Sequence, residues 1–193
     1  GTMHEIELDT FTPKILLSSH VDSINAVVFP KNLSTTTETA MTSSERCCTA
    51  SNDGTIQIWD LSNYESILRI QEASEATCLS LVQRGDQMLI FSGWRDCSIR
   101  VYDASKGGDI VFYIPNAHRK PVSSIDVTDK YFVSAGEDGI VNVWSWSREL
   151  LCQFSEHRSK PVRSVRVLFS LSLSHFTHTY THLLLLLHRY AWT

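Results

Sequence analysis

Three residue types that can perform acyl-transfer chemistry recur together along this chain: a hydroxyl residue, a histidine and an aspartate. The two complete trios are His20, Thr49, Asp53 and His118, Ser134, Asp138. A serine hydrolase uses the same types, with the histidine as the base that activates the hydroxyl. Such a triad also needs an exposed nucleophile, an oxyanion hole and a cleft, and it is recognised by geometry. The sequence has no P-loop, H-E-x-x-H or G-x-S-x-G motif to favour other chemistry.

The trios belong to a longer repeat. Asp53, Asp96 and Asp138 begin three similar segments, 43 and 42 residues apart, and an aromatic residue follows each aspartate by six positions. Those aromatic residues are Trp59, Tyr102 and Trp144. A period of about 40 to 45 residues ending in Trp-Asp is typical of four-stranded propeller blades. Because residues that pack a repeat must recur with it, we interpret the trios as structural and predict that the chain is not an enzyme.

Short β-branched and aromatic runs, separated by Gly, Asp, Asn and Ser, fill each repeat and indicate strands and hairpins. The strands expected in the three repeats are 24–29, 47–51, 55–59 and 66–70; 77–81, 88–93, 98–102 and 110–114; and 122–127, 132–136, 140–144 and 150–154. A further repeat begins with 162–167 and then loses the pattern. The predicted fold class is therefore all-β, with about three complete four-stranded blades.

The aspartate, histidine, hydroxyl and aromatic positions resemble the Asp-His-Ser/Thr-Trp network of WD40 propellers. In such a network the aspartate accepts a histidine N–H, and the hydroxyl meets the histidine and accepts the indole N–H, so that every buried polar group is paired. The first and third repeats have all four positions. The second repeat has Ser92, Asp96 and Tyr102 but no histidine near 71–76, so its network is predicted not to close.

The repeats divide the chain into predicted segments. They are the second half of a truncated blade (1–17), a blade with a Ser/Thr-rich loop at 31–46 (18–70), two further blades (71–114 and 115–154), the first strand of another blade (155–167) and a low-complexity tail (168–193). Three blades and two partial ones are too few to close a ring, since propellers protect their edges by closing over 4 to 8 blades. We therefore expect both ends to be truncated and the isolated chain to be prone to aggregation.

The tail has an unusual composition. Alternating Ser-Leu and alternating Thr-His are what repeating dinucleotides encode, so residues 168–193 are interpreted as non-native or disordered. An alternative is that the tail histidines form a zinc site, because spacings of three, four and six residues suit a metal. Those histidines are His175, His178, His182 and His188. Low complexity favours the first interpretation, and we predict no metal and no cofactor.

Residues 1–122 resemble a particular group, the cilia- and flagella-associated WD-repeat proteins of axonemal doublet microtubules, at the start of their second propeller. The motifs that carry the resemblance are Gly1-x-Met3-His4-Glu5-Ile6, His20-x-Asp22, Leu68-Arg69-Ile70, Ser92-Gly93-Trp94-Arg95-Asp96 and Asn116-Ala117-His118-Arg119. The resemblance implies a non-enzymatic scaffold that lies against tubulin in a cilium or flagellum. The alternative is a substrate-recognition module of a larger protein, such as a ubiquitin ligase subunit or a kinesin-like protein.

Composition excludes few functions. The net charge of −4 does not favour nucleic acid as a partner, and the longest apolar run is too short for a membrane helix. Five cysteines without a C-x-x-C pair favour a reducing compartment, hence a cytoplasmic location that extends to the axoneme. We expect protein partners, with no nucleic acid, membrane or small-molecule substrate.

The residues beside the turn aspartates and after the histidines are predicted to share one face of the propeller. These candidate partner-binding residues are Asn52, Arg95, Glu137, Arg119, Lys120, Arg158 and Lys160. The basic members favour an acidic partner such as tubulin. The alternative is that they are solvated loop charges.

Overall fold

The structure is a computed structural model and describes residues 1–7, 9–10, 12–17, 20–33, 46–155, 160–168 and 184–187. Most of the predicted loop 31–46 lies outside these residues, as do Arg158, the four tail histidines and most of the tail.

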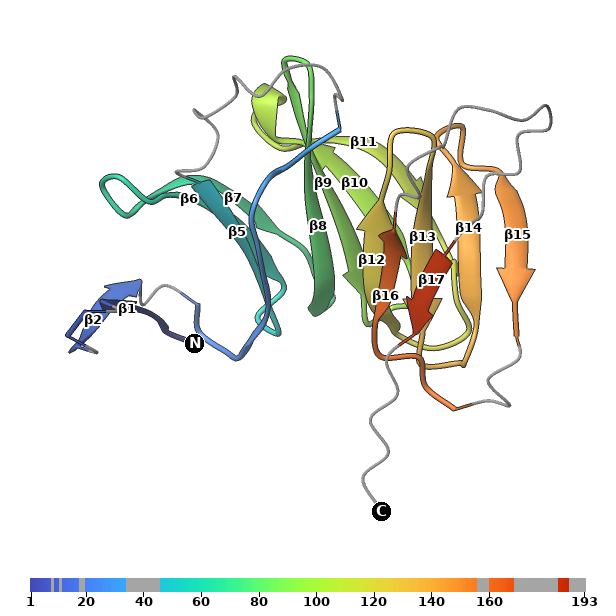
Figure 1. The fold of residues 1–193 in the computed structure, drawn as a ribbon, viewed down its shortest axis with the longest axis horizontal. Coiled ribbons are helices and arrows are strands. Elements are labelled where there is room, and N and C mark those ends of the chain that lie inside the picture. The colour runs from blue at the N-terminus through green and yellow to red at the C-terminus, as the bar shows by residue number, and fades with distance from the viewer. Residues whose placement is uncertain are drawn as a thin grey trace.

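Three antiparallel sheets of four consecutive strands make up the body of the protein, and they succeed one another in chain order across Figure 1. Blade one is β3 (Ile24–Val28), β5 (Arg46–Ser51), β6 (Thr55–Asp60) and β7 (Glu65–Gln71). Blade two is β8 (Ala76–Arg84), β9 (Gln87–Trp94), β10 (Ile99–Asp103) and β11 (Asp109–Ile114). Blade three is β12 (Val122–Val127), β13 (Tyr131–Gly136), β14 (Val141–Ser145) and β15 (Leu150–Phe154). The expected all-β architecture with three four-stranded blades is confirmed.

Two smaller sheets flank the three blades. The hairpin of β1 (Met3–Glu7) and β2 (Thr12–Leu17) lies beyond blade one in Figure 1. On the other side, β16 (Val165–Leu168) pairs with β17 (Leu184–Leu187), and β16 contacts β12 and β13. The strand expected at 162–167 therefore begins three residues later. Within the tail that was expected to be disordered, residues 184–187 form a strand because their backbone groups pair with those of β16.

Apolar side chains from neighbouring sheets interlock to form the core. One cluster joins blades one and two around Trp94, Ile56 and Leu81, which are fully buried. A second joins blades two and three around Phe91 and Phe132, whose ring centroids lie 5.3 Å apart. Blade two lies between two other blades and buries both faces, so its middle strands are apolar almost throughout, as in β9, where seven of eight residues are buried.

The structure also contains a short strand, β4 (Lys31–Asn32), that was not predicted. It follows β3 of blade one in the chain but belongs to the sheet of blade two. It pairs in parallel with β8, so that Lys31 lies opposite Val82. The 3₁₀ helix η1 (Ala104–Lys106) connects β10 to β11. No helix in the described part of the chain has the length and apolar character that crossing a membrane requires.

Candidate functional site

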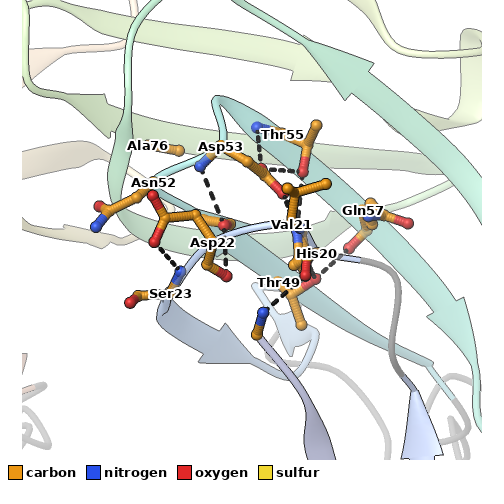
Figure 2. A network of polar contacts seen from close by, with 12 residues as sticks. His20, Val21, Asp22, Ser23, Thr49, Asn52, Asp53, Thr55, Gln57 and Ala76 are labelled. Carbon is orange, nitrogen blue, oxygen red and sulfur yellow. Dashed lines mark hydrogen bonds and ion pairs between the residues drawn. The ribbon is translucent and has the colours of Figure 1, made fainter.

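In blade one His20, Thr49 and Asp53 come together near the turn between β5 and β6 (Figure 2), and Trp59 reaches Thr49 from the other end of β6. His20 Nδ1 lies 3.2 Å from Asp53 Oδ2, and His20 Nε2 lies 2.7 Å from Thr49 Oγ1. Trp59 donates its indole N–H to the same Thr49 hydroxyl at 2.9 Å. A histidine that donates from Nδ1 to the carboxylate accepts the hydroxyl proton at Nε2, so one neutral tautomer satisfies every partner.

Asp53 is held as a carboxylate by its turn. Desolvation opposes ionisation, but the hydroxyl and N–H of Thr55, the N–H of Val21 and His20 together outweigh it and lower the pKa of Asp53 well below its ordinary value. Burial is the largest influence on His20 and lowers its pKa, although Asp53 acts in the opposite direction. The pair is therefore a carboxylate beside a neutral imidazole.

Blade three repeats this geometry with different residues. His118 lies 3.2 Å from Asp138 and 2.8 Å from the Ser134 hydroxyl, which accepts the Trp144 indole N–H at 2.9 Å. Burial also lowers the pKa of His118, against the influence of Asp138. Thr49 and Ser134 are both 0% exposed. A hydroxyl that is buried and already bound to an indole N–H cannot reach a substrate, so the geometry favours the structural interpretation of the trios.

Blade two is built differently, and the three residues predicted there bond to other residues and not to one another. Asp96 forms an ion pair with Arg100 at 2.6 Å, and Tyr102 donates its hydroxyl to Glu72 at 2.9 Å. Ser92 accepts the indole N–H of Trp94 at 2.8 Å and donates to the carbonyl of Arg100. The indole that sequence reasoning missed is thus Trp94, two residues after the hydroxyl.

The corresponding position of blade three is a glycine, which explains why blade two uses Trp94 where blade three uses a histidine. Gly136 follows Ser134 by two residues, as Trp94 follows Ser92, and a Cβ at Gly136 would lie 2.5 Å from His118 Nδ1. Blade one has the small Ser51 at this position beside His20, so it is a large side chain such as that of Trp94 that competes with a histidine for one space. Blade two has Glu72 where blades one and three have a histidine, and its Trp94 fills the space instead.

Three of the predicted partner-binding residues converge on one cavity. Asn52, Arg95 and Glu137, each directly before a turn aspartate, line a polar cavity of about 520 Å³ at the turn end of the inner strands. Sequence reasoning missed the other charged residues that line it, Glu75 and Arg163. Arg119, Lys120 and Lys160 are exposed and are not among its lining residues. Within the described residues, no cluster of His, Cys, Asp and Glu is arranged to hold a metal ion.

The cavity floor comes from a second repeated position, five residues after each histidine position. Asn25, Thr77 and Ser123 each interrupt the pairing of an inner strand and donate to a backbone carbonyl at the start of the next inner strand or, for Ser123, in the segment that leads into β16. The acceptors are the carbonyls of Ala76, Val122 and Val162, respectively. A small polar residue at this constant spacing was the sequence signal for these contacts.

Comparison with known proteins agrees with the fold. A sequence profile of the family "WD domain, G-beta repeat" matches residues 11–60 and 111–145. The RRP9 WD40 repeats superpose on 77% of this chain and 43% of their own, with a TM-score of 0.63 and 18% sequence identity. Residues 11–60 and 111–145 therefore resemble WD40 repeats, and the fold is that of WD40 β-propeller blades.

Among individual proteins, the chain is similar to Cilia- and flagella-associated protein 52 of Homo sapiens, with 28% identity over 86% of this chain, and to that of Chlamydomonas reinhardtii, with 31% identity over 58%. The resemblance to the cilia- and flagella-associated WD-repeat proteins is thus confirmed at modest identity. The Methylosome protein WDR77 of Xenopus laevis is also similar, with 29% identity over 56% of this chain and 34% of its own. The chain spans a quarter of the human relative and 16% of the algal one.

Proposed function

We propose that this chain is part of a non-catalytic interaction scaffold of the ciliary or flagellar axoneme, and that the turn-side face of its blades binds an acidic protein surface such as tubulin. The observation that supports this most directly is the convergence of Asn52, Arg95 and Glu137 on one cavity, because blades placed side by side make one continuous surface there. Similarity to Cilia- and flagella-associated protein 52 in two distant organisms supports the axonemal location.

Charge beside the cavity supports an acidic partner. Arg119 and Lys120 are exposed, and their side chains have no ion pair with any residue in the described ranges. Lys160, in the segment between β15 and β16, is a third exposed cation. Arg158, predicted to belong to the same surface, lies outside the described residues. Unpaired cations on one face attract an anionic partner and accelerate its association.

Microtubule co-sedimentation tests the proposal. Arg119→Glu with Lys120→Glu should abolish most of the binding, whereas Lys130→Glu with Arg148→Glu, the same charge change at the opposite end of blade three, should leave it intact. Removing the acidic tubulin tails with subtilisin should have the same effect as the first pair of substitutions. Equal binding by both double variants would contradict the assignment of this face.

A second candidate is a substrate-recognition module in a larger multidomain protein. The observation in its favour is a similarity, 27% identity over 65% of this chain, to the DENN domain and WD repeat-containing protein SCD1 of Arabidopsis thaliana, whose name joins WD repeats to another domain. Imaging the tagged protein in ciliated cells separates the two candidates, because only the axonemal scaffold concentrates along the cilium.

A further inference from the structure

The cavity on the turn-side face contains one carboxylate with no partner. Glu137 is exposed, and its carboxylate makes no hydrogen bond or ion pair with any residue of the described ranges; only its backbone N–H is used, by the carbonyl of Pro121. The other acidic residue of the cavity, Glu75, forms an ion pair with Arg95 at 3.0 Å. The free negative charge in this cavity is therefore that of Glu137.

Most other polar groups of the cavity already form hydrogen bonds within the protein. Asn25 donates to Asn52 at 2.6 Å and to the carbonyl of Ala76 at 2.8 Å. Thr77 and Ser123 donate to carbonyls of the next blade. Arg163 is exposed, lines the same cavity and has no ion pair with any residue of the described ranges; its neighbour Val162 donates its N–H to the carbonyl of Gly136, next to Glu137. A ligand that enters the cavity therefore meets a rigid hydrogen-bonded floor, with Glu137 on its wall.

The size of the cavity suits a single long side chain. At about 520 Å³ it falls within the range of 300 to 1,000 Å³ that is usual for ligand sites in proteins. An extended arginine carries its charge at the end of a narrow stem, and its planar guanidinium matches a carboxylate with two hydrogen bonds. The cavity thus has the space and one unpaired carboxylate for a basic side chain, although its own Arg163 and the loops beside it are cationic.

We propose that the partner of this face is a segment with one arginine or lysine flanked by acidic residues: the basic side chain enters the cavity and pairs with Glu137, and the flanking carboxylates contact Arg119 and Lys120. This inference rests on the proposed function and specifies its partner. Glu137 acts as a specificity residue, because a segment that is acidic throughout leaves its carboxylate unpaired and repelled.

The binding of two peptides to the whole chain, measured by fluorescence anisotropy, tests the inference. The inference and simple attraction by the cationic loops predict opposite orders of affinity for the two peptides. One is acetyl-Glu-Glu-Arg-Glu-Glu-amide, and the other has citrulline, the neutral isostere of arginine, at its centre. Attraction by the cationic loops alone would favour the citrulline peptide, which carries one more net negative charge. Pairing with Glu137 should instead make the arginine peptide bind about tenfold tighter, as one charge-assisted hydrogen bond predicts.

Substitution of the specificity residue completes the test. Glu137→Gln should reverse the preference, so that the citrulline peptide binds tighter, while the control Glu149→Gln, at the opposite end of blade three, should keep the preference for arginine. If both peptides bind, citrulline more tightly, and Glu137→Gln changes nothing, the inference about the basic residue is overturned and the acidic-partner proposal stands. If neither peptide binds, the acidic-partner proposal fails, and this inference fails with it.

Discussion

At the scale of residues, the polar network is a means of burying a hydroxyl, an imidazole and an indole together. Each network hydroxyl in blades one and three accepts the indole N–H and donates to the histidine, so the hydroxyl, the imidazole and the indole of the network are all paired. Blade two reaches the same result with Trp94 and a backbone carbonyl. Its Arg100 also stacks on the Trp94 ring, 4.7 Å from the centroid, while it pairs with Asp96.

Gly136→Ala should destabilise the protein by about 1–3 kcal/mol, because the new Cβ would lie 2.5 Å from both His118 Nδ1 and Asp138 Oδ1 in a packed interior. The free energy of unfolding from urea titration measures the effect. The double variant Gly136→Ala with His118→Ala should cost less than the sum of the single variants, since removal of the imidazole vacates the space. Additive costs would contradict this account.

Acid should destabilise the protein from about pH 6.5 downward. The folded state lowers the pKa of His20 and His118 below the ordinary 6.5. As the pH falls below about 6.5, the unfolded chain therefore binds more protons than the folded protein, and the free energy of unfolding decreases. Asp53 has a lowered pKa as well, but its contribution is fully present above its unfolded pKa near 4 and is lost only below that. The change in the urea midpoint between pH 7.5 and pH 5.5 therefore measures the effect of protonating these two histidines.

The control for this pH dependence is His20→Gln with His118→Gln, which should lower stability at pH 7.5 and flatten its dependence on pH between 7.5 and 5.5. An unchanged slope in this variant would mean that other groups carry the proton uptake.

At the scale of elements, side chains from the inner strands connect one blade to the next. Asp126 of β12 is buried, accepts the N–H of Val167 in β16 at 2.8 Å, and forms an ion pair with Lys31 of β4. Leu33, next to β4, packs on the cluster shared by blades two and three. The segment that leaves blade one therefore runs alongside β8, and its described residues contact blade three.

A double-mutant cycle tests whether Lys31 and Asp126 act as a pair. Lys31→Met should be more costly in the wild-type chain than in the Asp126→Asn background, with a coupling of about 0.5–3 kcal/mol, because a buried carboxylate needs its partner. Urea denaturation measures the four variants. Arg166→Met is the control, since Arg166 lies 4.0 Å from Asp126 and is mostly exposed, so its coupling should be smaller. Zero coupling for Lys31 would show that the contact is incidental.

At the scale of the whole molecule, blade one exposes apolar side chains at a position where blades two and three bury them. Val27 occupies the inner-strand position of Leu79 and Ile125, each of which lies opposite the network hydroxyl of its blade. Leu79 and Ile125 pack on the preceding blade and are 5% and 2% exposed, whereas Val27 is 46% exposed and the nearby Phe29 is 59% exposed. Exposed apolar side chains on a sheet edge favour association between chains.

The isolated chain should therefore associate with itself, and Val27→Ser with Phe29→Ser should reduce the association. Light scattering as a function of protein concentration measures the effect. Ile110→Ser with Val111→Ser, which changes two exposed apolar residues of the outer strand β11, is the control and should leave association unchanged. A wild-type chain that is monomeric and melts cooperatively would contradict the prediction.

The sequence alone determined the fold and most strand positions, because the repeat period, the alternation of apolar residues and the turn residues are local properties of the chain. It also identified the networks of blades one and three from the spacing of residues such as His118 and Ser134. It did not reveal the role of Trp94, since Trp94 stands at the position of Gly136 and fills the space that a histidine takes in blade three.

The tertiary structure decided which residues meet across blades. Lys31 and Asp126 are 95 residues apart, and the interruptions at Asn25, Thr77 and Ser123 become contacts only when one inner strand lies against the next. The convergence of Asn52, Arg95 and Glu137 on one cavity has the same origin. Contacts within a blade follow from a repeating local pattern, whereas contacts between blades depend on how the twisted sheets pack side by side.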